Sequence, residues 1–197
     1  MGFQKNYPTQ FLTPLREKTR LERYNEKLKN ASYIPGYLAT INFIHDDNLA
    51  LLIRNRACFG MKGIFVIGSI PPRNFLKSTL DLVDIKSFPN PASFLRFARE
   101  QEFEVLSLEI TESSRDIREY PFDFSHDTVF VVGNESYGIP DEILLNTHHI
   151  HIPMNGPGFC LNSAQASTIL SWEFMRRYCE YEDRTVKAIS QSGDEDS

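Results

Sequence analysis

Three segments of the chain place polar side chains next to small residues, a combination typical of ligand sites. They are residues 46–55 (DDNLALLIRN), 131–140 (VVGNESYGIP) and 152–162 (IPMNGPGFCLN). Each combines apolar residues with a few polar groups that could orient a small molecule in a concave site. Together they are the first candidates for chemistry in this chain.

In the second segment, Gly133 and Gly138 flank Asn134 and Glu135 directly after an apolar run. Glycines let a ligand approach the backbone closely, and a carboxylate can orient a substrate group. The same residues also fit a tight turn capped by Glu135. On these residues alone, the turn is the better interpretation.

The third segment holds two prolines and two glycines within residues 153–158, and a helical pattern follows at Cys160, Leu161 and Asn162. Asparagine is a favoured residue at a helix N-cap, so this segment also fits a plain connection from a strand to a helix. Cys160 could act as a nucleophile, but no base is assigned near it.

The histidines His148, His149 and His151 resemble metal ligands by composition. Only His149 and His151 share a face of a strand, and no carboxylate or thiol follows at ligand spacing. We therefore interpret them as a histidine cluster on an edge strand and expect no metal. The cysteines Cys58, Cys160 and Cys179 form no CxxC pair and are expected to be free thiols.

Strand and helix patterns alternate along the chain. Strands are expected at 37–45, 63–69, 103–110 and 127–135 and within ILLNTHHIHIP (143–153), and helices at 46–59, 91–100 and 161–178. This alternation predicts an α/β fold with a parallel sheet covered by helices on both faces. In such folds, the loops at the carboxyl ends of the strands bind ligands.

The length and composition favour one globular domain with two appendages. The chain has 197 residues, 41% of them hydrophobic, and no apolar stretch long enough to span a membrane. The N-terminus lacks the apolar core of a signal peptide, so we expect the cytoplasm. The pattern divides the chain into a basic helical arm at 1–36, ended by Pro35 and Gly36, a domain at 37–179 and an acidic disordered tail at 180–197.

The net charge of −5 argues against a nucleic-acid partner, but its distribution weakens that argument. Residues 1–30 carry seven bases and three acids, whereas the chain from Glu180 onward carries six acids and two bases. The helix expected at 13–31 could contact an RNA backbone, or it could be a solvated face with ion pairs. The sequence does not distinguish RNA contact from a solvated helix face.

The three segments, taken together and in this order, resemble the three motifs of the SpoU/TrmH branch of the SPOUT superfamily, the knotted RNA methyltransferases that use S-adenosylmethionine. The resemblance covers about residues 37–178. The residues that match are Asn48, Ala50 and Arg54 in the first motif, Gly133, Asn134, Glu135, Gly138, Ile139 and Pro140 in the second, and Ile152, Pro153, Met154, Gly156, Leu161 and Asn162 in the third.

The resemblance implies a deep trefoil knot in the C-terminal third and methyl transfer to a ribose 2′-hydroxyl of tRNA or rRNA. It implies that S-adenosylmethionine contacts a set of cavity residues: Gly133, Ile152, Leu161, Leu108, Met154 and Gly156. Arg54 is then the residue that activates the nucleophile. Asn48, Glu135 and Asn162 orient the ribose and the loop, and Cys160 takes the place of a serine.

Two residues depart from the family pattern. Ala50 replaces the usual glycine of the first motif, and Cys160 replaces the serine before Leu161 and Asn162. These departures motivate an alternative function, a catalytically weak knotted protein that binds RNA or the cofactor without turnover.

The resemblance also implies a homodimer. The apolar residues Leu51, Ile169, Trp172 and Phe174 are expected to lie at its interface. Which RNA and which nucleotide are methylated cannot be read from the sequence.

Overall fold

The computed structural model describes residues 22, 26, 29–41, 46–69 and 85–193. The chain divides into two compact units, residues 1–32 and residues 33–197. In the first unit, Glu22, Glu26 and Lys29 are helical, and the N–H of Asn30 donates to the carbonyl of Glu26 at 3.2 Å. The rest of the helix predicted at 13–31 lies outside the described residues.

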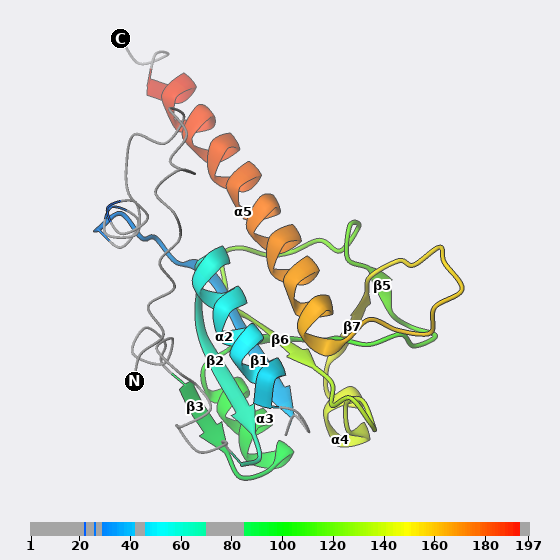
Figure 1. Ribbon diagram of the computed structural model, residues 1–197. Coiled ribbons are helices and arrows are strands. Elements are labelled where there is room, and N and C mark those ends of the chain that lie inside the picture. The colour runs from blue at the N-terminus through cyan, green and yellow to red at the C-terminus, as the bar shows by residue number, and fades with distance from the viewer. Residues whose placement is uncertain (1–21, 23–25, 27–28, 42–45, 70–84, 194–197) are drawn as a thin grey trace, which may run out of the picture. The chain divides into compact units, whose positions relative to one another are not determined.

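The second unit is built on a seven-stranded parallel sheet with the order β3-β2-β1-β6-β4-β7-β5 (Figure 1). The strands are β1 (Ile34–Ile41), β2 (Met61–Ile67), β3 (Ile85–Phe88), β4 (Glu104–Leu108), β5 (Arg115–Asp116), β6 (Thr128–Val132) and β7 (His148–His151). Every residue of β6 is buried, because this strand lies at the centre of the sheet. The parallel sheet predicted from the sequence is confirmed.

Helices cover both faces of this sheet (Figure 1). They are α2 (Asp46–Phe59), α3 (Pro91–Glu100), α4 (Asp141–Leu144) and α5 (Ser163–Gly193). Leu52 of α2 and Phe174 of α5 pack with Phe130 in one core cluster, whereas Phe94 of α3 packs with Val131 in the other. Since Phe130 and Val131 are neighbours on β6, the two clusters lie on opposite faces.

The domain begins earlier than residue 37, because Pro35 and Gly36 lie inside β1 and do not end the arm. A Cβ atom on Gly36 would lie 2.7 Å from Cε1 of Phe174 and 2.9 Å from Cε of Met61. A larger residue would therefore force the Phe174 and Met61 side chains to shift where α5 and β2 approach β1. The pairing register with β2 shifts between Ile34 and Tyr37, which accommodates the proline.

The disordered tail predicted from residue 180 is wrong for residues 180–193, which continue α5. The segment from Phe159 to Ser192 contains neither glycine nor proline. Carboxylates that suggested a solvated tail have partners one turn earlier: Glu180 pairs with Arg176, and Glu182 accepts a hydrogen bond from the Tyr178 hydroxyl. Residues 194–197 lie outside the described part of the chain.

Phe174 corrects one part of the expected dimer interface. Its side chain is fully buried within the chain, 4.8 Å from the Phe130 ring between centroids, so it cannot contact a partner. Leu51, Ile169 and Trp172 are exposed by 43%, 40% and 49%, as expected for an interface. Apolar residues occur on both faces of α5 in the sequence, so the sequence alone does not show which face packs against the sheet.

The sheet topology determines where ligand-binding loops gather. β1, β6, β4 and β7 are neighbours and run parallel, so their carboxyl ends meet at one edge. The 133–140 loop follows β6 and the 152–162 loop follows β7. The trefoil knot implied by the resemblance stays a prediction. Among the described residues, no helix is both long and apolar enough to cross a membrane.

Candidate functional site

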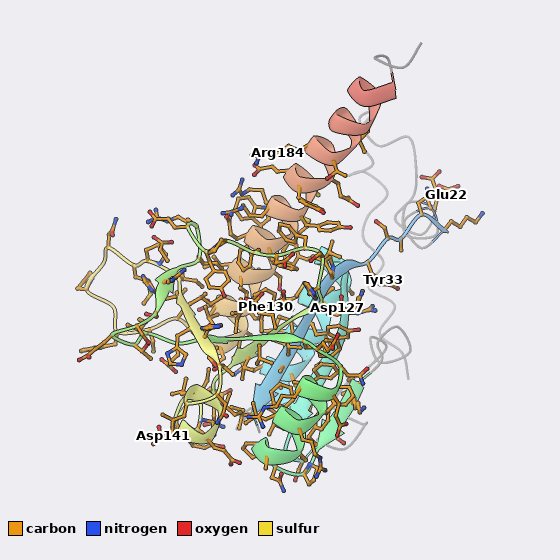
Figure 2. The ribbon with its side chains drawn as sticks, turned by 180° about the vertical axis from the view of Figure 1, so that it is seen from behind. Glu22, Tyr33, Asp127, Phe130, Asp141 and Arg184 are labelled. Carbon is orange, nitrogen blue, oxygen red and sulfur yellow. The ribbon has the colours of Figure 1, made fainter. Side chains whose placement is uncertain are left out.

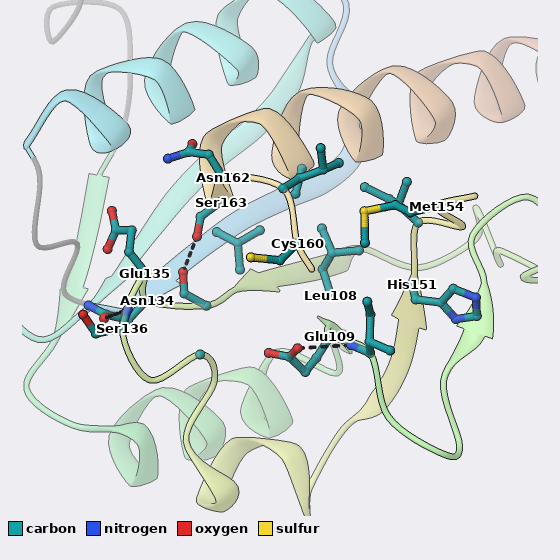
Figure 3. Close-up of a pocket in the computed structure, with 17 residues that line it drawn as sticks. Leu108, Glu109, Asn134, Glu135, Ser136, His151, Met154, Cys160, Asn162 and Ser163 are labelled. Carbon is teal, nitrogen blue, oxygen red and sulfur yellow. Dashed lines mark hydrogen bonds between the residues drawn. The ribbon is translucent and has the colours of Figure 1, made fainter. Parts of the chain in front are cut away.

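A cavity of about 350 Å³ lies at the carboxyl ends of β4, β6 and β7, and we call it the strand-end cavity (Figure 3). Its volume lies at the lower end of the range for small-molecule sites, roughly 300–1,000 Å³. The residues that line it are Leu108, Glu109, Ile110, Val132, Gly133, Asn134, Glu135, Ser136, Gly138, His151, Ile152, Met154, Cys160, Leu161, Asn162, Ser163 and Ala166.

The 133–138 loop forms one wall of the strand-end cavity with its backbone. Asn134 and Gly138 exchange two backbone hydrogen bonds of 2.9 and 3.0 Å, and Gly138 has a φ of +68°. A Cβ atom on Gly133 would lie 2.8 Å from the carbonyl carbon of Gly138, so no side chain fits there. The Asn134 side chain caps the turn, because its oxygen accepts from the N–H of Ser136 at 2.8 Å.

The start of α5 forms the opposite wall. Asn162 caps this helix as predicted, because its side-chain oxygen accepts from the N–H of Ala164 at 2.9 Å. The hydroxyl of Ser163 donates to the carbonyl of Gly133 at 2.8 Å, which ties the helix to the 133–138 loop (Figure 3). The two halves of the cavity are therefore held in a fixed relation.

A short chain of hydrogen bonds joins all three motifs. The Asn162 amide donates to the side-chain oxygen of Asn48 at 3.2 Å, and the Asn48 amide donates to the Glu135 carboxylate. Asn48 is buried although it is polar, and these contacts satisfy it. Residues separated by as many as 114 positions thus meet beside the strand-end cavity, which brings together three of the predicted catalytic residues.

Arg54 does not line the strand-end cavity. It is exposed on α2, six residues beyond Asn48, and forms no hydrogen bond or ion pair within the described part of the chain. Its neighbour Asn55 is buried and fixes α2 to α5, donating to the Ala164 carbonyl at 3.2 Å and to the Ser167 hydroxyl at 2.8 Å. The guanidinium of Arg54 is therefore an available cation on a rigid support.

The predicted cofactor residues gather in one place with one exception. Gly133, Ile152, Leu161, Leu108 and Met154 line the strand-end cavity, whereas Gly156 does not. Nothing lies within 4 Å of the position of a Cβ atom on Gly156, so this glycine faces open space.

Sequence reasoning missed Glu109, which follows Leu108 directly at the end of β4. One of its carboxylate oxygens accepts from the N–H of Ile110 at 3.1 Å, and the other lies 3.0 Å from the position of a Cβ atom on Gly138. With Glu135 it places two carboxylates in the strand-end cavity, and the lining residues include no lysine or arginine. The negative lining favours a ligand that carries positive charge.

Two of the three histidines of β7, His149 and His151, have protein partners. His149 contacts the Thr111 hydroxyl through Nδ1 and the Leu144 carbonyl through Nε2, both at 2.8 Å, and His151 contacts the Ser114 hydroxyl at 3.1 Å. The strand is not at the edge of the sheet, because β5 pairs with it. Among the described residues, no three His, Cys, Asp or Glu side chains form a group that could hold a metal ion.

Comparisons with known proteins agree with this geometry. The chain is 27% identical over 139 residues to a 23S rRNA (uridine(2479)-2′-O)-methyltransferase of Streptomyces viridochromogenes, which covers 66% of the chain and 48% of that protein. The chain spans about half the length of the curated relatives it matches.

Two solved structures have the same fold. An AdoMet-bound rRNA methyltransferase from Sinorhizobium meliloti superposes with a TM-score of 0.66 and 25% identity, over 75% of this chain and 58% of that one. The Aquifex aeolicus TrmH/SpoU tRNA modifying enzyme superposes with a TM-score of 0.69 and 23% identity, over 82% and 86%. The profile of the SpoU rRNA Methylase family matches residues 36–172, from within β1 to the first third of α5, and the chain belongs to that family.

Proposed function

We propose that the chain is an S-adenosylmethionine-dependent methyltransferase that acts on a ribose 2′-hydroxyl of tRNA or rRNA. The observation that carries this proposal is the meeting of Asn48, Glu135 and Asn162 beside a cavity at the strand ends. The names of the related proteins support the same reaction class, since they include an rRNA 2′-O-methyltransferase and a tRNA modifying enzyme. We expect the trefoil knot and a cytoplasmic location to accompany this activity.

The strand-end cavity suits S-adenosylmethionine in shape and charge. Leu108, Ile152 and Leu161 offer apolar walls for an adenine ring, and Gly133 presents backbone where no side chain fits. The cofactor supplies a methyl group on a positively charged sulfur. Glu109 and Glu135 match that charge, because both carboxylates line a cavity without lysine or arginine.

Positioning is the main task of the protein residues in this reaction. A ribose hydroxyl is a poor nucleophile, so the chain must hold it in line and stabilise the negative charge that develops on its oxygen. Asn48, Glu135 and Asn162 are already linked by hydrogen bonds and would orient the ribose and the loop. Cys160 occupies the serine position of the third motif and lines the cavity with Glu135 and Asn162.

Arg54 would hold the phosphate next to the reacting ribose. A guanidinium does not give up its proton in proteins, so it is unsuited to act as a simple base. A charge-assisted grip on the phosphate lowers the cost of the developing alkoxide. The exposed position of Arg54 on α2 leaves the guanidinium accessible to an RNA strand.

A homodimer would complete this arrangement. Leu51 lies three residues before Arg54 on α2, and the exposed Ile169 and Trp172 lie on α5, which packs against α2. A second copy of the chain that covers these apolar residues would bring Arg54 close to the partner's cavity. Light scattering at micromolar concentration tests this, and a monomeric mass would count against it.

Methyl transfer to RNA tests the proposed function directly. Purified protein, tritiated S-adenosylmethionine and total tRNA or rRNA should give labelled RNA, and nucleoside mapping should place the label on a ribose. Calorimetry with the cofactor provides the control. Cofactor binding without transfer to any RNA would favour the non-catalytic alternative, and no binding at millimolar cofactor would rule out the methyltransferase.

A further inference from the structure

A second cavity, of about 330 Å³, lies against the C-terminal half of α5. It is lined by Phe122, Phe124, Arg176, Arg177, Glu180, Tyr181 and Arg184, and we call it the arginine–aromatic cavity. The two phenylalanines come from the segment between β5 and β6, and the other residues come from α5. It shares no lining residue with the strand-end cavity, and the proposed function leaves it without a role.

The aromatic wall of this cavity is anchored in the core and open on one side. The Phe124 ring lies 5.3 Å from the Phe174 ring and 5.3 Å from the Tyr181 ring, measured between centroids. Phe174 is fully buried, whereas Tyr181 is 44% exposed. Tyr181 therefore presents an aromatic surface that is supported from behind, which is the arrangement on which nucleic-acid bases stack.

The three arginines differ in how their charge is used. Arg176 pairs with Glu173 at 2.7 Å and with Glu180, and the hydrogen bonds that its guanidinium donates to Glu173 raise the pKa of Arg176 above the usual value. Arg177 donates to two backbone carbonyls, those of Arg118 at 2.7 Å and Tyr120 at 3.2 Å. Its nearest carboxylate in an ion pair is Glu173, at 4.0 Å.

Arg184 is the most available of the three cations. It is exposed and forms no hydrogen bond or ion pair within the described part of the chain. Figure 2 places it on the part of α5 that extends beyond the sheet. Three arginines line the cavity together with one carboxylate, Glu180, and a second carboxylate, Glu173, pairs with Arg176. The three positive charges outnumber the two negative charges, so the cavity is positive although the chain carries a net charge of −5.

We propose that the arginine–aromatic cavity binds one nucleotide of an RNA strand. The base stacks on Tyr181, and a phosphate contacts Arg184 with support from Arg177. An arginine can bind the phosphate of a nucleotide, and a supported aromatic ring can stack on its base. An acidic peptide would contact the arginines but would not stack on the ring. The site rests on the proposed function in that RNA is the substrate, and it adds a contact remote from the strand-end cavity.

Fluorescence anisotropy with a labelled oligouridylate of twelve nucleotides tests this site on the full chain. Tyr181→Ala should weaken binding by about five-fold or more, the lower end of the loss of one stacked base. Arg184→Gln should weaken binding and lower the slope of log affinity against log salt by about 0.7, as expected for one phosphate contact on a single strand. Tyr181→Phe should retain affinity, because the ring remains.

Arg96→Gln is the matched control, since Arg96 is exposed on α3, across the sheet from α5. If Tyr181→Ala and Arg184→Gln bind the oligonucleotide no more weakly than this control, the cavity is not an RNA site. Equal competition by polyglutamate would also overturn the proposal in favour of an acidic protein partner. If the variants keep their RNA affinity and still methylate RNA, this site is refuted and the proposed function stands. If the variants lose RNA affinity but the wild-type protein never methylates RNA, the proposed function is refuted and this site stands.

Discussion

The strand-end cavity and the arginine–aromatic cavity have similar volumes but are built in opposite ways. The first has one wall formed by the backbone of the 133–138 loop and carries two carboxylates, Glu109 and Glu135. The second is walled by side chains, most of them from one helix, and carries three arginines. A backbone-built site is sensitive to an added Cβ atom, whereas a site built from side chains is sensitive to their removal. Different substitutions should therefore weaken ligand binding at the two cavities.

The largest expected effect separates catalysis from both cavities. Arg54→Ala should lower methyl transfer by about two to three orders of magnitude, the usual loss on removing one preorganised charge-stabilising donor. Affinity for the cofactor should stay unchanged, because Arg54 does not line the strand-end cavity. Single-turnover transfer and calorimetry measure the two quantities. Transfer at the wild-type rate would make Arg54 a structural residue.

Gly133→Ala should damage only the strand-end cavity. The added Cβ atom would meet the backbone of Gly138 at 2.8 Å, and overpacking of this kind costs about 1–3 kcal/mol. We expect cofactor affinity to fall by about ten-fold or more by calorimetry, with RNA affinity unchanged. Gly158→Ala is the control, because no atom lies within 4 Å of its Cβ position. Equal losses in the two variants would contradict a backbone-built wall.

A smaller effect is expected from Glu109→Gln, which removes one charge and keeps the shape. Affinity for S-adenosylmethionine should fall by about two- to five-fold, in line with a partly exposed charge pair, while affinity for the demethylated product, which lacks the sulfonium charge, stays the same. Glu112→Gln is the control, since Glu112 is exposed nearby and does not line the cavity. A parallel loss for cofactor and product would instead assign Glu109 to the adenosine part.

The smallest effect is expected at Cys160. Cys160→Ser restores the hydroxyl of the family pattern in a side chain of nearly the same size, so methyl transfer should stay within about two-fold or rise. Initial rates at saturating cofactor measure this. A large fall in rate would show that the thiol itself has a role in the strand-end cavity.

Local sequence signals predicted part of the fold, and the family resemblance predicted residues of the strand-end cavity. The helix at 91–100 has the predicted bounds because Asn90 caps it through the N–H of Ser93 at 2.9 Å and Pro91 starts it. The motif residues Gly133, Ile152 and Leu161 meet because parallel strands end at one edge of the sheet. These features depend on short stretches of chain and on a sheet topology that the alternation of elements indicates.

Other features depend on contacts between distant segments that no local pattern records. Phe122 and Phe124 lie in a segment without regular structure, and only folding places Phe122 against Phe174 and Phe124 against Tyr181. The two-residue strand β5 is too short to give a periodic signal, so His149 and His151 were assigned to an edge. The acidic composition after Glu180 hid the continuation of α5, because composition does not show that Glu180 is paired with Arg176.

The unbroken helix α5 sets a fixed distance between its two ends. This helix begins beside Asn162 in the strand-end cavity and carries Arg184 twenty-one residues after Ser163, a span of about 32 Å at the helical rise of 1.5 Å per residue. Without glycine or proline before Gly193, that length is fixed by residue count and not by loop flexibility. An RNA that contacts both ends would be selected by the distance between two of its nucleotides, a property of its shape rather than of its base sequence.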